Sequence, residues 1–182
     1  MEYLEPPLLF TDGAFEPLDG EGGTAGVGGV LLDPADMSYH FPVDPPAEVM
    51  ALLKEKRNPI HQLELLPVLI ASLLWKERIR GRTLLSFLDN EGAKAALVSG
   101  YSTNETSAAI VNRIGDEFAA LFARTWFDRV PSASNPSDAP SRGLAPPAFE
   151  RWSPPVQTLV TPEVKALSKC FLAVEDFRAA HR

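Results

Sequence analysis

Three apolar segments in the first 43 residues restrict the fold more than any other feature of this sequence. They are Leu8–Ala14, Thr24–Asp33 and Met37–Val43, and each is bounded by turn residues such as glycine or proline. The segments that join them have about ten residues or fewer, which is too short for a helical crossover. The three segments therefore predict an antiparallel meander, with the third strand at its edge.

A long helix is predicted after the third strand. Asn58 and Pro59 supply an N-cap and a first-turn proline, and the helix is expected to end at Gly81. The segment between them is apolar on nearly all sides, which indicates burial on more than one side. Pro67 lies inside this helix, where it removes one backbone hydrogen bond and should kink the first turns.

Two more strands and two more helices follow in alternation. Thr83–Asn90 and Thr125–Val130 predict short strands. Between them the sequence predicts a helix over 91–100 and a second helix that opens with a capping box of Ser102 and Glu105. Strand–helix crossovers after a meander predict an α/β fold: a mixed five-stranded sheet, with three antiparallel strands and then parallel strands, and helices on both faces.

The last part of the chain differs in composition from the rest. We expect a domain over residues 1–143, a Pro-rich linker over 144–160 and an amphipathic helix over 161–182. The apolar stripe of that helix consists of Val164, Leu167, Phe171 and Val174. Such a helix is expected to pack on its own domain or on a partner.

Charge and cysteine content restrict the function. Lys and Arg number 17 against 24 Asp and Glu, a net charge of −7 that argues against a free-standing electrostatic binder of nucleic acid. Divalent cations held by clustered acids would neutralise part of that charge. A single cysteine, the absence of a signal peptide pattern and an apolar run too short for a bilayer predict an intracellular protein, cytoplasmic or nuclear, without membrane association.

Four carboxylates from separate segments are predicted to meet at one edge of the sheet. Asp12 and Asp89 end the first and fourth predicted strands, whose carboxyl ends share an edge if the two strands lie side by side and parallel. Glu64 lies in the first turns of the crossover helix, which begins over that edge, and Asp138 follows the last strand. Clustered carboxylates repel one another unless they hold cations. This arrangement predicts a site for two Mg²⁺ ions, of the kind that supports phosphoryl transfer.

The motifs around these acids resemble ribonuclease H. They are TDGA after an apolar strand, TAGVGGVLL, HQLELL at the start of a helix, FLDN at the end of a strand, and SNPSDAPSRG. Over about residues 7–143 the chain is most similar to the ribonuclease H-like domains attached to the reverse transcriptases of retrotransposons, including DIRS-like elements. The resemblance implies hydrolysis of the RNA strand of an RNA–DNA hybrid, with Mg²⁺ as cofactor, Mn²⁺ as a substitute, and a reverse transcriptase or polymerase domain as a possible partner.

The resemblance also implies a role for each acid. Asp12 would bridge both ions, Glu64 and Asp89 would hold the ion at the leaving group, and Asp138 would help to hold the other ion.

Three residues are expected to contact the substrate. The backbone of Gly13 and the side chain of Asn90 are the nearest groups that could read a 2′-hydroxyl, and Arg142 could contact a phosphate.

The sequence departs from cellular ribonucleases H in two places. RVPSASNPSD lacks the histidine that such enzymes often have before the last aspartate, and His61 is interpreted as a solvated residue at the helix start. The GYSTN connection between two helices has no room for a basic protrusion. The densest basic run lies at the far end of the long helix and is interpreted as structural or as a partner contact; it consists of Lys76, Arg78, Arg80 and Arg82.

Three other functions are compatible with such a fold. A proofreading exonuclease requires a second acid two residues after the first, where this chain has Ala14. An integrase-type transposase has its last acid on a helix, whereas Asp138 stands between two prolines and is expected in a loop. The third alternative is a catalytically degenerate domain that acts as a structural or interaction module beside a reverse transcriptase.

Overall fold

The computed structural model describes residues 5–18, 23–35, 38–45, 47–53, 59–144 and 150–151. The predicted helix over 161–182 and most of the predicted linker lie outside these residues, as does Asn58, the predicted N-cap. The domain boundaries therefore remain a prediction.

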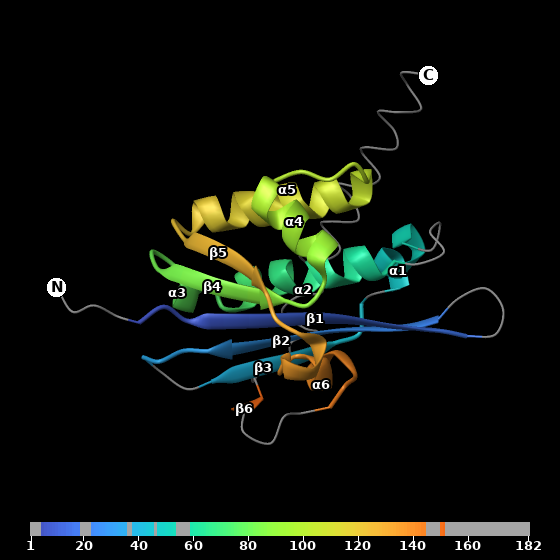
Figure 1. Cartoon of the computed structure of the whole chain (residues 1–182), viewed down its shortest axis with the longest axis horizontal. Helices are drawn as coiled ribbons and strands as arrows, with labels where there is room; N and C mark the ends of the chain where they lie inside the picture. The colour runs from blue at the N-terminus through green and yellow to red at the C-terminus, as the bar shows by residue number, and fades with distance from the viewer. Residues whose placement is uncertain are drawn as a thin grey trace.

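A mixed β-sheet forms the centre of the molecule (Figure 1). Strands β1 (Leu8–Pro17), β2 (Gly23–Leu32) and β3 (Tyr39–Val43) pair antiparallel in that order. Strands β4 (Thr83–Leu88) and β5 (Arg124–Arg129) continue the sheet on the other side of β1, and the pairs β1–β4 and β4–β5 are parallel. The order β5-β4-β1-β2-β3 confirms the predicted five-stranded sheet.

A short sixth strand, β6 (Glu150–Arg151), pairs parallel with β3. The prediction that the third strand lies at the edge of the sheet is therefore wrong. The two-residue strand falls inside the predicted linker, where a composition rich in proline gave no strand signal.

The helices follow the predicted order with two additions. They are α1 (Ala47–Leu53), α2 (Ile60–Leu74), α3 (Lys76–Ile79), α4 (Glu91–Ser99), α5 (Glu105–Ala120) and α6 (Asp138–Ser141), with a 3-10 turn, η1, at Ser132–Ser134. Neither α1 nor α6 was predicted, since each is short and has no long apolar period.

The predicted helix over 60–81 is in fact two helices, α2 and α3. Trp75 separates them with φ −107° and ψ 24°, and its fully buried ring lies 5.2 Å from that of Phe41. Gly81 has a positive φ of 70°, as expected of a residue that ends a helix. The helical break is set by packing of one large side chain, which a periodic pattern does not reveal.

The predicted capping box at the start of α5 is also wrong. Asn104 is the N-cap, and its side chain accepts a hydrogen bond from the backbone N–H of Ser107 at 3.0 Å. Ser102 instead accepts a bond from the backbone N–H of Asn104 at 3.2 Å. Both residues are good caps, and the sequence alone did not tell which one the chain uses.

Helices cover both faces of the sheet. Gly13 faces α2, since a Cβ there would lie 2.5 Å from the backbone of Leu63. Gly28 faces α6, since its Cβ would lie 2.3 Å from the backbone N of Ser141. Gly28 pairs with Asp12, the neighbour of Gly13 in β1, and successive residues of a strand point to opposite faces. Helices α2 and α6 therefore lie on opposite sides of the sheet.

Helix α2 is the centre of the hydrophobic core. Every residue from Gln62 to Ser72 is buried, because α2 contacts β1 and β2 on one side and α5 on another (Figure 1). This burial confirms the reading of a helix that is apolar on nearly all sides. None of the described helices combines the length and apolar character that a membrane-spanning helix needs.

Candidate active site

The first two acids of the site lie where β1 and β4 stop pairing. The ladder between these strands ends at Phe10–Phe87, and Asp12 and Asp89 each follow two residues later. Asp89 directly follows β4, as predicted. Asp12, however, does not end its strand, because β1 continues to Pro17 in its pairing with β2.

Glu64 reaches the same place from α2. A side chain at Gly13 would collide with the backbone of Leu63 and Glu64, so glycine there permits close contact between β1 and the first turns of α2. One carboxylate oxygen from each of Asp12, Glu64 and Asp89 lies within 4.8 Å of the other two. The predicted meeting of these three acids is thus present in the structure.

Burial changes the protonation of two of these acids. Asp12 is 4% exposed, and its burial raises its pKa to about 6, with the charges of Asp89 and Asp138 adding to the effect. Burial and the charges of Asp12 and Asp89 raise the pKa of Glu64 to about 9. A hydrogen bond from the backbone of Gly13 acts in the opposite direction on Glu64. Such raised pKa values show that the cluster is unfavourable as three bare anions.

One carboxylate oxygen of the cluster makes no hydrogen bond within the described part of the chain. Glu64 Oε2 is buried and has no hydrogen-bond partner among the described residues. A buried carboxylate oxygen without a donor is costly, and a hard divalent cation would satisfy it. The three carboxylates, with this oxygen of Glu64 among them, fit a site for a hard divalent cation.

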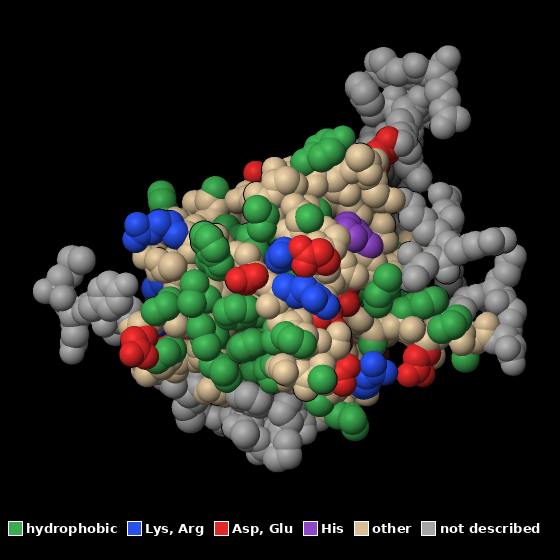
Figure 2. Space-filling model, in the orientation of Figure 1, with side chains coloured by type: hydrophobic (Ala, Val, Ile, Leu, Met, Phe, Trp, Pro, Cys, Tyr) green, Lys and Arg blue, Asp and Glu red, His purple; other side chains and the backbone are tan. Residues whose placement is uncertain are grey.

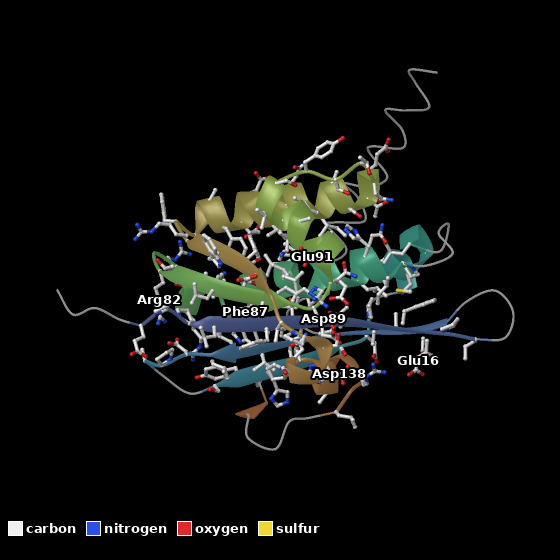
Figure 3. All side chains as sticks on the ribbon, in the orientation of Figure 1. Glu16, Arg82, Phe87, Asp89, Glu91 and Asp138 are labelled. Carbon is white, nitrogen blue, oxygen red and sulfur yellow. The ribbon has the colours of Figure 1, made fainter. Side chains whose placement is uncertain are left out.

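Asp138 lies beside this cluster rather than within it. Its side chain is 48% exposed and accepts a hydrogen bond from Arg142 Nε at 3.1 Å, while Arg142 also lies 3.6 Å from Glu16 (Figure 3). Asp138 is the first residue of α6, so its predicted position in a loop is wrong. The argument that set an integrase-type transposase aside loses that support, although α6 is only one turn long.

Residues that the sequence analysis did not select hold the Asp138 segment on the sheet. Asn135 Nδ2 donates to the carbonyl oxygen of Thr11 at 3.0 Å, and the backbone N–H of Ser137 donates to Asn135 Oδ1 at 3.2 Å. Ser141 Oγ donates to Asp12 Oδ2. The side chains of Asn135, Ser137 and Ser141 are all buried, so these bonds fix the segment against β1. The unusual density of Asn and Ser in SASNPSDAPS was the available signal.

The predicted substrate contacts have different surroundings. Gly13 is buried under α2, and its backbone donates a hydrogen bond to Glu64. Asn90 is the N-cap of α4, and its Oδ1 accepts a bond from the backbone N–H of Ala93 at 2.9 Å. Arg142 is half exposed near the acids. Gly13, Asn90 and Arg142 all remain proposed substrate contacts.

The basic run at the far end of α2 and α3 has structural contacts. Arg82 forms a bidentate ion pair with buried Asp33, with N–O distances of 2.8 and 3.0 Å. The Cζ atom of Arg78 lies 4.0 Å from the centroid of the Tyr39 ring. Arg80 pairs with Glu77 at 3.4 Å. These contacts agree with the structural interpretation.

His61 is not the solvated residue that the sequence suggested. It is half-buried, and its Nδ1 lies 3.0 Å from Ser107 Oγ. A Cβ at Gly92 would lie 3.3 Å from its ring, so His61 packs between the starts of α2, α4 and α5. Periodicity could not show this packing of three helix ends.

Comparison with known proteins identifies the fold. No family model matches the chain, and no curated protein matches it in sequence. Several ribonucleases H1 are among the solved structures that resemble it. That of Halobacterium salinarum is 18% identical with a TM-score of 0.55, and covers 76% of this chain and 96% of its own. LC11-RNase H1, isolated from compost, is 14% identical with a TM-score of 0.56, and covers 76% of this chain and 94% of its own. The same protein in complex with an RNA/DNA hybrid gives a TM-score of 0.52 at 15% identity, covering 76% of this chain and 95% of that one. The chain thus has the ribonuclease H fold.

Proposed function

We propose that this protein is a metal-dependent endonuclease that hydrolyses the RNA strand of RNA–DNA hybrids. The observation that carries the proposal is the meeting of Asp12, Glu64 and Asp89, whose carboxylate oxygens lie within 4.8 Å of one another. The ribonuclease H fold supports it, since LC11-RNase H1 has been solved with an RNA/DNA hybrid.

Asp12, Glu64 and Asp89 would hold two divalent cations together with Asp138. When bound, Mg²⁺ ions stabilise the negative charge that develops on a phosphodiester under attack, and they align the reacting oxygens. Asp12 would be the acid best suited to contribute to both ions, because it belongs to the cluster with Glu64 and also accepts a hydrogen bond from Ser141 in the Asp138 segment.

The chain positions these ligands before any substrate arrives. Ser141 donates to one oxygen of Asp12, and the backbone of Gly13 donates to Glu64. Arg142 shields the exposed carboxylate of Asp138 and stands where a phosphate of the hybrid could replace that partner. Asn90 stands next to Asp89, where its amide Nδ2 could donate to a 2′-hydroxyl.

A retroelement origin is part of the proposal. It rests on HQLEL and NPSDAPSRG, which resemble the domains attached to retrotransposon reverse transcriptases, and it implies a polymerase domain as partner. A catalytically degenerate module beside such a polymerase is the second candidate. The net charge of −7 and the short connection of residues 100–104 between α4 and α5 favour that alternative.

An assay with a hybrid labelled on either strand tests the function. We expect Mg²⁺-dependent cleavage of the RNA strand alone, with 5′-phosphate and 3′-hydroxyl ends, and no cleavage of the matching DNA duplex. Equal cleavage of hybrid and DNA would indicate a general nuclease. No cleavage with Mg²⁺ or Mn²⁺ would indicate the degenerate module.

A further inference from the structure

One face of the sheet carries an apolar area that no described element covers. Residues paired in register point to the same side of a sheet, as do alternate residues of a strand. Leu8 pairs with Leu32 and Leu85, Phe10 pairs with Phe87, and Leu85 pairs with Trp126. We define these as the open apolar patch: Leu8, Phe10, Leu32, Leu85, Phe87 and Trp126.

The patch is accessible in the described part of the molecule. Trp126 is 65% exposed and the other five side chains are half-buried, with the rings of Phe10 and Phe87 stacked at 5.1 Å. Figure 2 shows hydrophobic side chains gathered over β1, β4 and β5, in the left half of the view. Helix α6 lies on this same face but covers only the part near Gly28. A continuous apolar area of this kind marks a binding surface.

The chain itself has a segment that can reach the patch. The described residues end at Arg151 in β6, and 31 residues follow. From β6 to β1 there are three strand spacings, or about 14 Å. Residues 152–160 can extend over roughly 30 Å. The predicted helix over 161–182 can therefore begin above the patch.

The apolar stripe of that segment matches the patch in size. One helical face carries the stripe, and its last residue lies ten positions after its first: Val164, Leu167, Phe171 and Val174. That separation is about 15 Å along a helix axis. The patch extends from β2 to β5, again three strand spacings or about 14 Å. The stripe, laid across the strands, would contact all four of them.

We propose that residues 161–182 form a helix that packs its apolar stripe on the open apolar patch of the same chain. The helix adds a second layer to a sheet face that α6 covers only in part. None of the clustered carboxylates takes part, so this packing does not depend on the proposed nuclease function.

Cys170 permits a direct test, because it is the single cysteine of the chain and flanks the apolar stripe. A spin label on Cys170 should broaden the amide signals of β4 and β5 in the full-length protein and leave those of α4 unchanged. In a mixture of isotope-labelled chains without the spin label and spin-labelled chains without isotope, the broadening should vanish. No broadening in the first sample would overturn the proposal. Broadening in the mixture would also overturn it, because a second copy would then occupy the patch.

A double-mutant cycle in the full chain gives an independent measurement. Trp126→Ser and Phe171→Ser should each lower Tm by about 2–4 °C, and the double variant should lower it by little more than one alone. Tyr101→Ser is the matched control, since Tyr101 is 66% exposed on the α4–α5 connection, away from the patch. Its effect should simply add to that of Phe171→Ser. Additive effects of Trp126→Ser and Phe171→Ser would contradict packing of the apolar stripe on the open apolar patch.

Discussion

Two buried carboxyl groups dominate the chemistry at the scale of single residues. Asp12 and Glu64 have pKa values of about 6 and about 9, against ordinary values of 3.8 and 4.5. Both therefore bind protons more tightly in the folded protein than in the unfolded chain. Their contribution to stability is complete below about pH 4 and is lost as the pH rises through the two folded-state pKa values.

In chelator, the free energy of unfolding should consequently fall between about pH 4 and pH 9. Glu64→Gln should flatten the upper part of this profile and raise stability at pH 8 by on the order of 1 kcal/mol or more. Added Mg²⁺ should reduce the loss in the parent at high pH, because the ions compete with protons for the same oxygens. Denaturant titrations at several pH values measure this. A parent whose stability rises across that range would refute the raised pKa values.

Replacement of Asp12 separates function from stability. Asp12→Asn should reduce hybrid cleavage to background, because a neutral amide cannot replace a carboxylate shared by two ions. In chelator at pH 8 the free energy of unfolding of the variant should be about 1–3 kcal/mol higher than that of the parent, since one buried like charge is gone. Its Oδ1 can still accept the bond from Ser141. A large loss of stability would instead make Asp12 a structural residue.

At the scale of secondary-structure elements, the close contact between β1 and α2 positions Glu64. A Cβ at Gly13 would lie 2.5 to 2.8 Å from backbone atoms of Leu63 and Glu64. Gly13→Ala must therefore shift α2, at a cost of about 1–3 kcal/mol, and weaken metal binding through Glu64. Gly115→Ala is the control, since a Cβ there meets nothing within 4 Å and α5 should gain about 0.5–1 kcal/mol. Similar melting temperatures for the two variants would argue against a tight β1–α2 contact.

The same elements show what the sequence could predict. Short connections and apolar periods were enough for the meander, for the parallel strands β4 and β5, and for burial of α2, because these depend on local patterns and chain length. The meeting of Asp12, Glu64 and Asp89 followed from that topology. The anchoring of Asp138 by Asn135 did not, because the bond joins residues 124 positions apart and depends on side-chain register. The break at Trp75 likewise depends on its contact with Phe41.

At the scale of the whole molecule, charge opposes binding to nucleic acid. The net charge is −7, and Arg78, Arg80 and Arg82 are engaged in structural contacts at the far end of α2 and α3. The isolated chain should therefore bind a hybrid with a dissociation constant of roughly micromolar or weaker at physiological salt, and with a shallow salt dependence. Attachment to a polymerase would raise the effective concentration of the substrate. Binding measured in Ca²⁺, which blocks cleavage, tests this, and a nanomolar constant would show that no attachment is needed.

Calorimetric titration with Mg²⁺ and Mn²⁺ tests the proposed function most directly, because that function requires Asp12, Glu64 and Asp89 to form a metal site. The parent should bind both ions, and Asp12→Asn and Glu64→Gln should each abolish or greatly weaken that binding. Glu91→Gln is the control, since Glu91 is an exposed acid near the site that pairs with Lys94 at 2.7 Å. It should bind the ions as the parent does. No binding by the parent, or equal binding by the parent, Asp12→Asn and Glu64→Gln, would contradict a metal site formed by these acids.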